Sequence, residues 1–311
     1  MRVSFLSFPE HLSQNLRRLS VENLRLQMQA TSGQRVSEAS DDPAAVRRFL
    51  DLQSEFQISA QYLSTTQKLD GLVQSGYRVM TELKKTADRA NELAKSLNSL
   101  SAAPENLKSL ATEVNQLLEQ SLSLANTREN GVYLFGGNDN TRPPFESERG
   151  ADGKVSSYRY VGSSKVPQYD ISPGVSLGVL PPGGNDGTGQ VPGLFQDSAA
   201  GVDLIGHLVE LRNALSSGDV AGIQARLSPA LDRDIDQVLT SLVSVGAIQN
   251  QLTTTGRQLE ARSVVLTGAM SREVDVDLAE TLVNLNETQA AYTAALQSGA
   301  KVMKQSLLDY L

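Results

Sequence analysis

Residues 12–30 read LSQNLRRLSVENLRLQMQA, and the apolar side chains in this stretch recur in steps of four and three residues. This spacing places them on one narrow face of a helix, which is typical of a coiled-coil seam. Gly33 follows the last turn, where a left-handed residue can end the helix without a Cβ penalty. The stripe contains Leu12, Leu16, Leu19, Asn23, Leu26 and Ala30.

The other end of the chain has a stripe with the same spacing. It contains Leu278, Leu282, Leu285, Gln289, Tyr292, Leu296, Gly299, Met303, Leu307 and Tyr310. We therefore predict that residues 1–40 and 272–311 form a terminal assembly coiled coil. The polar members, Asn23 and Gln289, are expected to fix the register of this coiled coil at some cost in stability.

The segments between the two ends predict a helical rod body made of residues 41–135 and 200–271. Apolar periodicity from Ala44 to Leu100 would give a helix of roughly 85 Å at 1.5 Å per residue. The chain breaks at Pro104, and a helix then returns to about Arg128. Residues 136–199 differ, because Gly, Pro, Asn and Asp cluster around short β-branched and aromatic runs. The expected fold is mainly α, an elongated helical rod with a small β-rich insertion.

The adjacent carboxylates of Asp41 and Asp42 suggest either a chemical site or the start of a helix. Neighbouring helical residues point about 100° apart, so the two groups do not face one substrate from a helix. The residue before a proline avoids the α region, whereas proline is well tolerated at the first helical position. We therefore predict that Asp42 is a helix N-cap and that Pro43 is the first residue of that helix.

The other candidates for chemistry do not support an enzyme. Gly174–Gly178 match the G-x-S-x-G pattern of hydrolases, but Pro173 precedes it and prolines follow, so the required strand-turn-helix is not expected. A hydrolase that uses Ser176 is the alternative of a different class. His11 and His207 are the only histidines, and neither occurs in a zinc-protease motif. The acidic residues lack the ligand spacing of a calcium loop. We expect no catalytic residue, no metal and no cofactor.

The amino-acid composition limits the kinds of partner and the cellular setting that can be expected. The net charge of -7 disfavours nucleic acid as a partner, because phosphate binding requires a concentrated basic surface. The chain has no cysteine, so no disulfide framework is expected. No stretch reaches ~18 apolar residues and the N-terminus lacks an apolar signal core, so neither a membrane span nor a secretory signal is expected.

The apolar seams and the charges of the terminal helices suggest association. Residues 12–30 carry three arginines against one glutamate, whereas residues 275–298 carry four acidic residues and no basic residue. The two helices are therefore expected to pair. One pair of narrow helices leaves apolar surface uncovered, which favours packing between copies of the chain. An ordinary intramolecular bundle is the alternative.

Several short motifs resemble the flagellin superfamily. They are Ser32–Val36, Ala39–Ala44, Tyr133–Gly137, Asp275–Glu280 and Ser306–Leu311. Flagellin proper usually has Asp-Asp-Ala-Ala-Gly where this chain has Asp41 to Ala45 as Asp-Asp-Pro-Ala-Ala. This difference favours the members of the superfamily that join the hook to the filament, and flagellin proper, the filament subunit, is the alternative.

The resemblance implies a structural adapter of the bacterial flagellum, with no enzymatic activity. Such proteins join a hook-side junction ring to the flagellin filament by coiled-coil assembly. The implied partners are hook-associated protein 1, flagellin, further copies of the chain in a ring, and a flagellar export chaperone, with no nucleic acid and no membrane. The implied location is extracellular, at the hook-filament junction, after type III export without a cleaved signal peptide.

Overall fold

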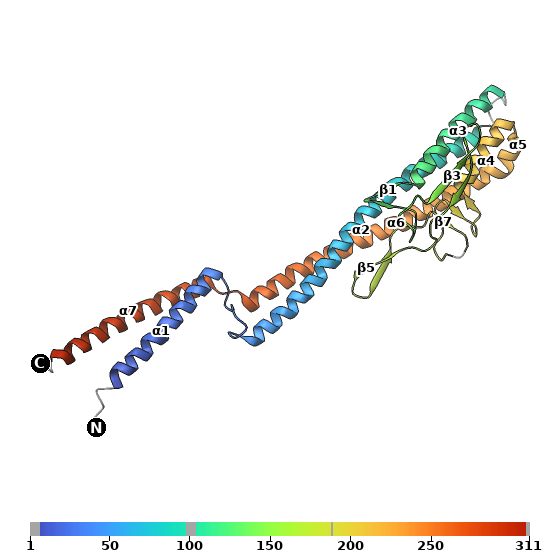
Figure 1. Cartoon of the computed structure of the whole chain (residues 1–311). Helices are drawn as coiled ribbons and strands as arrows, with labels where there is room; N and C mark the ends of the chain where they lie inside the picture. The colour runs from blue at the N-terminus through green and yellow to red at the C-terminus, as the bar shows by residue number, and fades with distance from the viewer. Residues whose placement is uncertain (1–6, 98–103, 188, 309–311) are drawn as a thin grey trace. The chain divides into compact units, whose positions relative to one another are not determined.

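The computed structural model of the protein describes residues 7–97, 104–187 and 189–308, and most of them are helical (Figure 1). The mainly α fold with a small β-rich insertion is therefore confirmed. The α-helices are α1 (Ser7–Ser32), α2 (Pro43–Ser96), α3 (Pro104–Ala125), α4 (Leu204–Ser217), α5 (Val220–Gly222), α6 (Ser228–Val274) and α7 (Leu278–Leu308). A π-helical turn, Ile223–Leu227, leads into α6.

The strands form small separate sheets between α3 and α4. They are β1 (Arg128–Glu129), β2 (Val132–Tyr133), β3 (Phe145–Arg149), β4 (Val155–Tyr160), β5 (Gln168–Ser172), β6 (Val175–Gly178), β7 (Gly184–Asn185), β8 (Gln196–Asp197) and β9 (Val202–Asp203). Three antiparallel hairpins pair β1 with β2, β3 with β4 and β5 with β6. In the fourth sheet, β8 pairs parallel with β7 and antiparallel with β9.

The contacts divide the chain into two compact units. Unit 1 contains residues 1–59 and 261–311, and unit 2 contains residues 60–260. Both boundaries fall inside long helices, α2 and α6, whereas the sequence placed its domain limits near the ends of helices. Helical periodicity continues across these boundaries, so the sequence pattern gives no signal of them.

The hydrophobic core of the described residues lies within unit 2. Its members run from Leu69 on α2 to Leu252 on α6, and they include residues of α3, α4 and the insertion. Three fully or almost fully buried aromatic rings mark its centre. Phe195 packs edge-on against Phe135 and Phe145, with ring centroids 5.5 Å and 5.2 Å apart. Edge-to-face aromatic contacts of this kind add to the stabilisation that burial gives.

The insertion shares this core with the helices. Phe145, Ile171 and Leu194 come from the insertion and are buried in the same cluster. Asn126, just after α3, donates to the carbonyl oxygen of Phe145 at 2.9 Å and accepts from its backbone nitrogen at 3.0 Å. Arg212 on α4 is buried and donates to the carbonyl oxygen of Val155 at 2.7 Å. Helices and insertion are therefore joined by packing and by hydrogen bonds.

A polar network at the base of α4 joins three elements. Asp234 on α6 is fully buried, accepts from the backbone nitrogen of Asp203 at 3.0 Å, and contacts Nδ1 of His207 at 2.7 Å. Asp203 also caps α4 by accepting from the backbone nitrogen of Gly206, and Tyr158 of β4 donates to its carboxylate. Such networks stabilise a fold when each buried polar group has a partner.

This network predicts a pH-dependent stability. Burial lowers the pKa of His207, but the hydrogen bond and charge of Asp234, with Asp203 and Glu210 nearby, outweigh it and raise that pKa. Burial also raises the pKa of Asp234, and its hydrogen bond with His207 opposes that shift. When a histidine has a higher pKa in the folded state than in the unfolded state, protonation stabilises the fold. This stabilisation is fully present below the unfolded pKa, ~6.5 for histidine, and is lost as the pH rises through the folded pKa.

We therefore expect the wild-type free energy of unfolding to fall more than that of His207→Gln between a pH below the unfolded pKa of ~6.5 and an alkaline pH. Denaturant unfolding at the two pH values measures this difference. His11→Gln is the matched control, because His11 is exposed on α1, and it should follow the wild type. Equal pH dependence in wild type and His207→Gln would contradict the prediction.

Candidate assembly surface

The stripe predicted on α1 is the inward face of that helix. Leu26 is buried, the other members of the stripe are half-buried, and most neighbouring residues on α1 are exposed. α1 and α7 pack side by side as an antiparallel pair (Figure 1). Leu12, near the start of α1, lies against Gly299 near the end of α7. The terminal helices therefore pair within one chain, as the sequence predicted.

The stripe predicted on α7 differs from the inward face in the structure. Leu285, Tyr292 and Gly299 do lie on the inward face. The remaining inward residues are Thr281, Thr288 and Ala295. Leu278, Leu282, Gln289 and Leu296 are exposed, so they do not take part in the α1–α7 contact within one chain, and their role in an assembly seam stays a prediction. The physical reason is close helix approach, which small residues permit and leucines at the same positions would prevent.

The final part of the predicted stripe cannot be placed on either face. Met303 and Leu307 lie in the last turns of α7, beyond the residues whose side chains the structure describes. Tyr310 lies outside the described residues. A role for these three residues in assembly stays a prediction.

Gly299 shows how closely the two helices approach. A Cβ atom at this position would lie 2.5 Å from Cδ2 of Leu12, so a larger residue would displace the leucine. Farther along α1, the side-chain oxygen of Asn23 accepts a hydrogen bond from Nε2 of Gln27 at 2.8 Å. These two residues and Tyr292 of α7 line a surface hollow of about 330 Å³. The polar seam residue Asn23 is thus half-buried and hydrogen-bonded, whereas Gln289 is exposed.

The segments that connect these helices to the rest of unit 1 are joined to each other. Gly33 ends α1 with a φ of 72°, a left-handed conformation that glycine adopts without strain. Its carbonyl oxygen accepts from the backbone nitrogen of Val276 at 3.0 Å, and the backbone nitrogen of Arg35 donates to Val274 at 2.7 Å. Arg48 of α2 forms an ion pair with Glu273 of α6 at 2.8 Å. These bonds hold the two connections side by side.

The two adjacent aspartates have different structural tasks. α2 begins at Pro43, and Oδ1 of Asp42 accepts from the backbone nitrogen of Ala45 at 3.0 Å. The carboxylate of Asp41 accepts from the backbone nitrogens of Glu38 and Ser37, each at 3.0 Å. These hydrogen bonds lower the pKa of Asp41, and the bond from Ala45 lowers the pKa of Asp42. Helix capping and loop ordering therefore account for both groups.

Replacing Asp41 by alanine is expected to open the connection after α1, because Ser37 and Glu38 lose their acceptor. Trypsin should then cleave after Arg35 several-fold faster than in the wild type, since proteolysis follows local opening. Limited digestion followed by mass spectrometry measures this rate. Asp51→Ala, at an exposed position on α2, is the control and should leave the rate unchanged. Unchanged cleavage in Asp41→Ala would show that the loop is held by other contacts.

A second capping aspartate, which was not predicted from the sequence, precedes α7. Oδ1 of Asp277 accepts from the backbone nitrogens of Ala279 and Glu280 at 2.9 Å and 3.2 Å. An aspartate one residue before the first helical position is a recognisable N-cap signal. Each connection into a long helix of unit 1 therefore ends in an aspartate cap.

The charges of the terminal helices do not pair with each other. Among the described residues, no ion pair joins α1 to α7. Arg25 pairs only with Glu22 on its own helix, at 4.0 Å, and Arg17 and Arg18 are exposed. Glu280 and Glu287 on α7 are exposed as well. The sequence predicted that opposite charge would join the two helices, whereas packing of their inward faces joins them.

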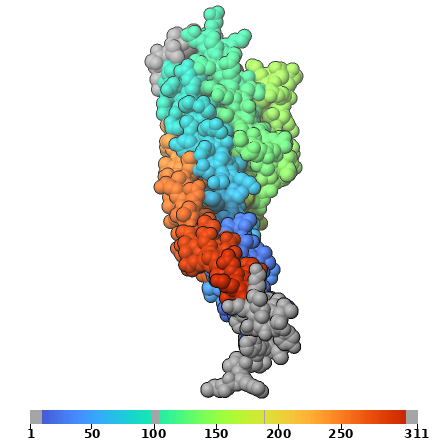
Figure 2. Space-filling model, turned by 90° about the vertical axis from the view of Figure 1, so that its left-hand side faces the viewer, coloured from blue at the N-terminus to red at the C-terminus, as the bar shows by residue number. Residues whose placement is uncertain are grey.

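Unit 1 exposes many apolar side chains and has few buried ones among the described residues, namely Leu26, Val36, Ala45 and Leu266. None of the residues of the described hydrophobic core belongs to unit 1. Eleven of the sixteen large apolar side chains that are exposed among the described residues lie there, in the helices α1, α2, α6 and α7. The most exposed are Val264 at 73%, Val21 at 68% and Val265 at 65%. Figure 2 shows α7 at the surface with α1 beside it. Unit 1 therefore exposes more large apolar side chains than unit 2 among the described residues.

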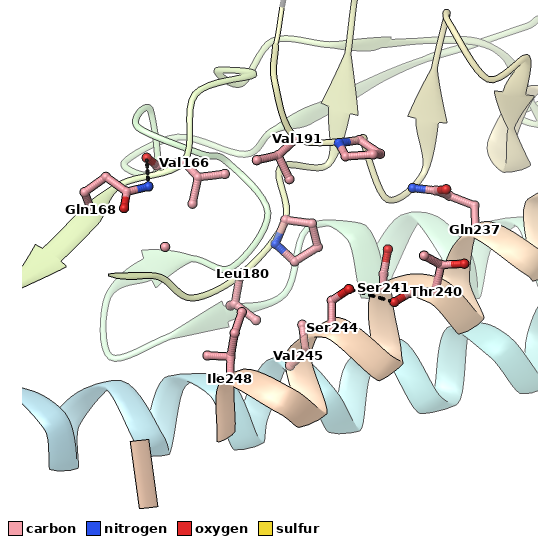
Figure 3. A pocket seen from close by; sticks show the side chains of 13 residues that line it. Val166, Gln168, Leu180, Val191, Gln237, Thr240, Ser241, Ser244, Val245 and Ile248 are labelled. Carbon is pink, nitrogen blue, oxygen red and sulfur yellow. Dashed lines mark hydrogen bonds between the residues drawn. The ribbon is translucent and has the colours of Figure 1, made fainter. Parts of the chain in front are cut away.

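Two further features of unit 2 are the serine of the G-x-S-x-G match and a pocket beside α6. Ser176 lies in β6 of a hairpin and donates to Asp170 at 2.5 Å, so the G-x-S-x-G match is a strand and turn rather than a nucleophile elbow. A pocket of about 290 Å³ lies between the insertion and α6 (Figure 3). Leu180, Val245 and Ile248 form its apolar part, and no charged side chain lines it.

Within the described ranges, no helix is long and apolar enough to cross a membrane.

Comparison with protein families shows matches at both ends of the chain. Residues 4–140 match the bacterial flagellin N-terminal helical region. Residues 229–311 match the bacterial flagellin C-terminal helical region. Together the matched segments cover more than half of the chain. They contain α1, α2, α3 and α7, and all of α6 except its first residue.

Three relatives match almost the whole chain. Flagellar hook-associated protein 3 of Escherichia coli is 25% identical, over 95% of this chain and 96% of the relative. The protein of the same name from Salmonella typhimurium is 23% identical, over 99% of both chains. Flagellin of Bacillus subtilis is 25% identical, over 95% of this chain and 96% of that protein.

The fold also has a solved counterpart. The structure of a flagellar hook-associated protein from Vibrio parahaemolyticus, described there as putative, superposes with a TM-score of 0.62 and 17% identity. The match covers 76% of this chain and all of the other. At this identity the likeness concerns the fold alone.

Proposed function

The chain belongs to the bacterial flagellin family, and we propose that it is a structural adapter that joins the hook side of the flagellum to the filament. Two of the three relatives described above are named hook-associated protein 3, which favours the adapter over a filament subunit. The Asp-Asp-Pro-Ala-Ala sequence that begins at Asp41 supports the same choice.

The distribution of apolar surface carries the proposal. The described hydrophobic core lies entirely in unit 2. Most of the large apolar side chains that are exposed to solvent lie in unit 1. Burying a large apolar side chain contributes roughly 1.5–3 kcal/mol, so covering this surface with neighbouring copies would supply a large assembly energy. Unit 1 is therefore the part of the molecule that we assign to assembly.

The proposed partners follow from this role. Copies of the chain form a ring, hook-associated protein 1 contacts it on the hook side, and flagellin contacts it on the filament side. An export chaperone covers the C-terminal helix before secretion, because an exposed apolar helix otherwise aggregates. The protein acts outside the cell at the hook-filament junction and is exported without a cleaved signal peptide. None of these tasks requires catalysis.

Deletion of the gene, followed by electron microscopy of the flagella and immunoblotting of the medium, tests the proposal. We expect cells with complete hooks, no attached filaments, and flagellin released into the medium. Expression of the full chain should restore attached filaments. Hooks without released flagellin would instead identify the chain as the filament subunit, and normal filaments would contradict both functions.

A further inference from the structure

Three exposed residues on α1 form a regular pattern around an apolar side chain. Val21 is 68% exposed, Arg18 precedes it by three residues, and Arg25 follows it by four. Residues three and four apart on a helix lie on one face, so the valine is bordered by a positive charge on each side. The only ion pair described for Arg25 is a long one, 4.0 Å, with the exposed Glu22. We refer to Arg18, Val21 and Arg25 as the basic triad.

Helix α7 has the same pattern with the opposite charge. Val283 is 56% exposed, Glu280 precedes it by three residues, and Glu287 follows it by four. We refer to these residues as the acidic triad. In both triads the charged residues are seven apart, which corresponds to roughly 10 Å along a helix. The triads therefore match in spacing and shape and are complementary in charge.

The two triads do not satisfy each other within one chain. Their valines are both more than half exposed, and no ion pair among the described residues joins α1 to α7. The inward faces of these helices are formed by other residues, such as Leu26 and Thr281. Each triad therefore lies on the outer surface of the helix pair without a partner on the other terminal helix.

We propose that the basic triad of one copy packs against the acidic triad of the next copy in the ring. This inference rests on the proposed function. α1 and α7 are antiparallel in each chain, so α1 of one copy runs opposite to α7 of a neighbour that points in the same direction. In this alignment Arg18 faces Glu287, Arg25 faces Glu280, and the two valines lie one residue, roughly 1.5 Å, out of register. The apolar contact excludes water between two ion pairs, which strengthens them.

Charge reversal tests the proposal in the full chain. Arg18→Glu with Arg25→Glu, and separately Glu280→Arg with Glu287→Arg, should each lower the amount of chain retained on isolated hooks by about tenfold or more, because attraction becomes repulsion. The variant with all four changes should recover to within about twofold of the wild type, because the signs are again opposite. Lys68→Glu with Arg257→Glu, at exposed positions in unit 2, is the charge-matched control and should be retained like the wild type.

Cysteine cross-linking tests the register directly, because the chain has no cysteine of its own. Chains with Val21→Cys and chains with Val283→Cys, mixed and assembled on hooks, should form a disulfide between the two kinds of chain on oxidation. Ser20→Cys with Gln289→Cys, exposed on other sides of the same helices, should not. Circular dichroism of the free variants verifies that they fold.

The results separate this inference from the function on which it rests. Retention of the reversed variants at the wild-type level, or failure of the fourfold variant to recover, would overturn the triad contact while leaving the adapter function intact. The same holds if no disulfide forms between Val21→Cys and Val283→Cys chains. Failure of the wild type to be retained on hooks would overturn both.

Discussion

A chain that carries Leu285→Asp and Tyr292→Asp is expected to fold its unit 2 normally and to lose filament attachment completely. Both residues lie on the inward face of α7, where an unpaired carboxylate would have to be buried against α1. Burying an unpaired charge costs several kcal/mol or forces the helices apart. The described core lies outside unit 1, so the thermal transition of unit 2 should stay unchanged.

Calorimetry of the free protein and electron microscopy of complemented deletion cells measure the two outcomes. Asn286→Asp with Gln289→Asp is the matched control, because both residues are exposed on the same helix. Cells with this control should build attached filaments. Attached filaments in cells with the Leu285→Asp and Tyr292→Asp chain would show that the α1–α7 contact is not needed for assembly.

Replacing Phe195 by alanine is expected to have the largest effect on stability. Its side chain is fully buried between Phe135 and Phe145, at the place where the insertion meets the helices. Removing a buried phenylalanine typically costs 3–5 kcal/mol, because contacts are lost and a cavity remains. Denaturant unfolding followed by circular dichroism should therefore show a loss of about that size.

Tyr77→Ala is the control for this change, since Tyr77 is 40% exposed on α2 and should alter stability by about 0.5 kcal/mol or less. A loss below about 1 kcal/mol for Phe195→Ala would mean that the aromatic cluster is not the centre of the core. The same experiment shows whether the insertion unfolds together with the helices. A single transition is expected, because Phe145 and Phe195 of the insertion belong to the core that α2 and α6 share.

Much of the fold could be predicted from apolar spacing. The steps of four and three residues from Leu12 identified the inward face of α1, and the break at Pro104 coincides with the start of α3. The clustered glycines and prolines identified the insertion. Asp42 before Pro43 indicated the start of α2, where Asp42 accepts from the nitrogen of Ala45. Local chemistry decides these features, so a single sequence reveals them.

The inward face of α7 could not be chosen correctly in the same way. Two stripes with the same spacing share Leu285, Tyr292 and Gly299, and the predicted stripe is the one with more leucines. The structure uses the stripe with Thr281 and Thr288, because close approach of α1 favours small side chains. Small residues repeated every seven positions, at 281, 288 and 295, are the signal that would have identified it.

Contacts between residues that are far apart in the sequence were not predicted either. The pairing of His207 with Asp234 joins residues on two different helices, and no local motif announces it. The sharing of one core between the insertion and the helices has the same origin. In both cases the sequence reveals the groups, whereas only the fold brings them together.

The absence of described core residues from unit 1 has a consequence for the order in which the structure forms. A segment whose remaining apolar surface is covered by neighbouring copies gains part of its stability by mass action, so its stability depends on the concentration of copies. Unit 1 of a single copy is therefore less stable than unit 1 of an assembled copy, and packing against the next copy supplies the additional stabilisation. Under the proposed function, addition of a copy to the assembly and completion of the fold of unit 1 would be one event, and polymers in dilute solution would be disfavoured by the same thermodynamics.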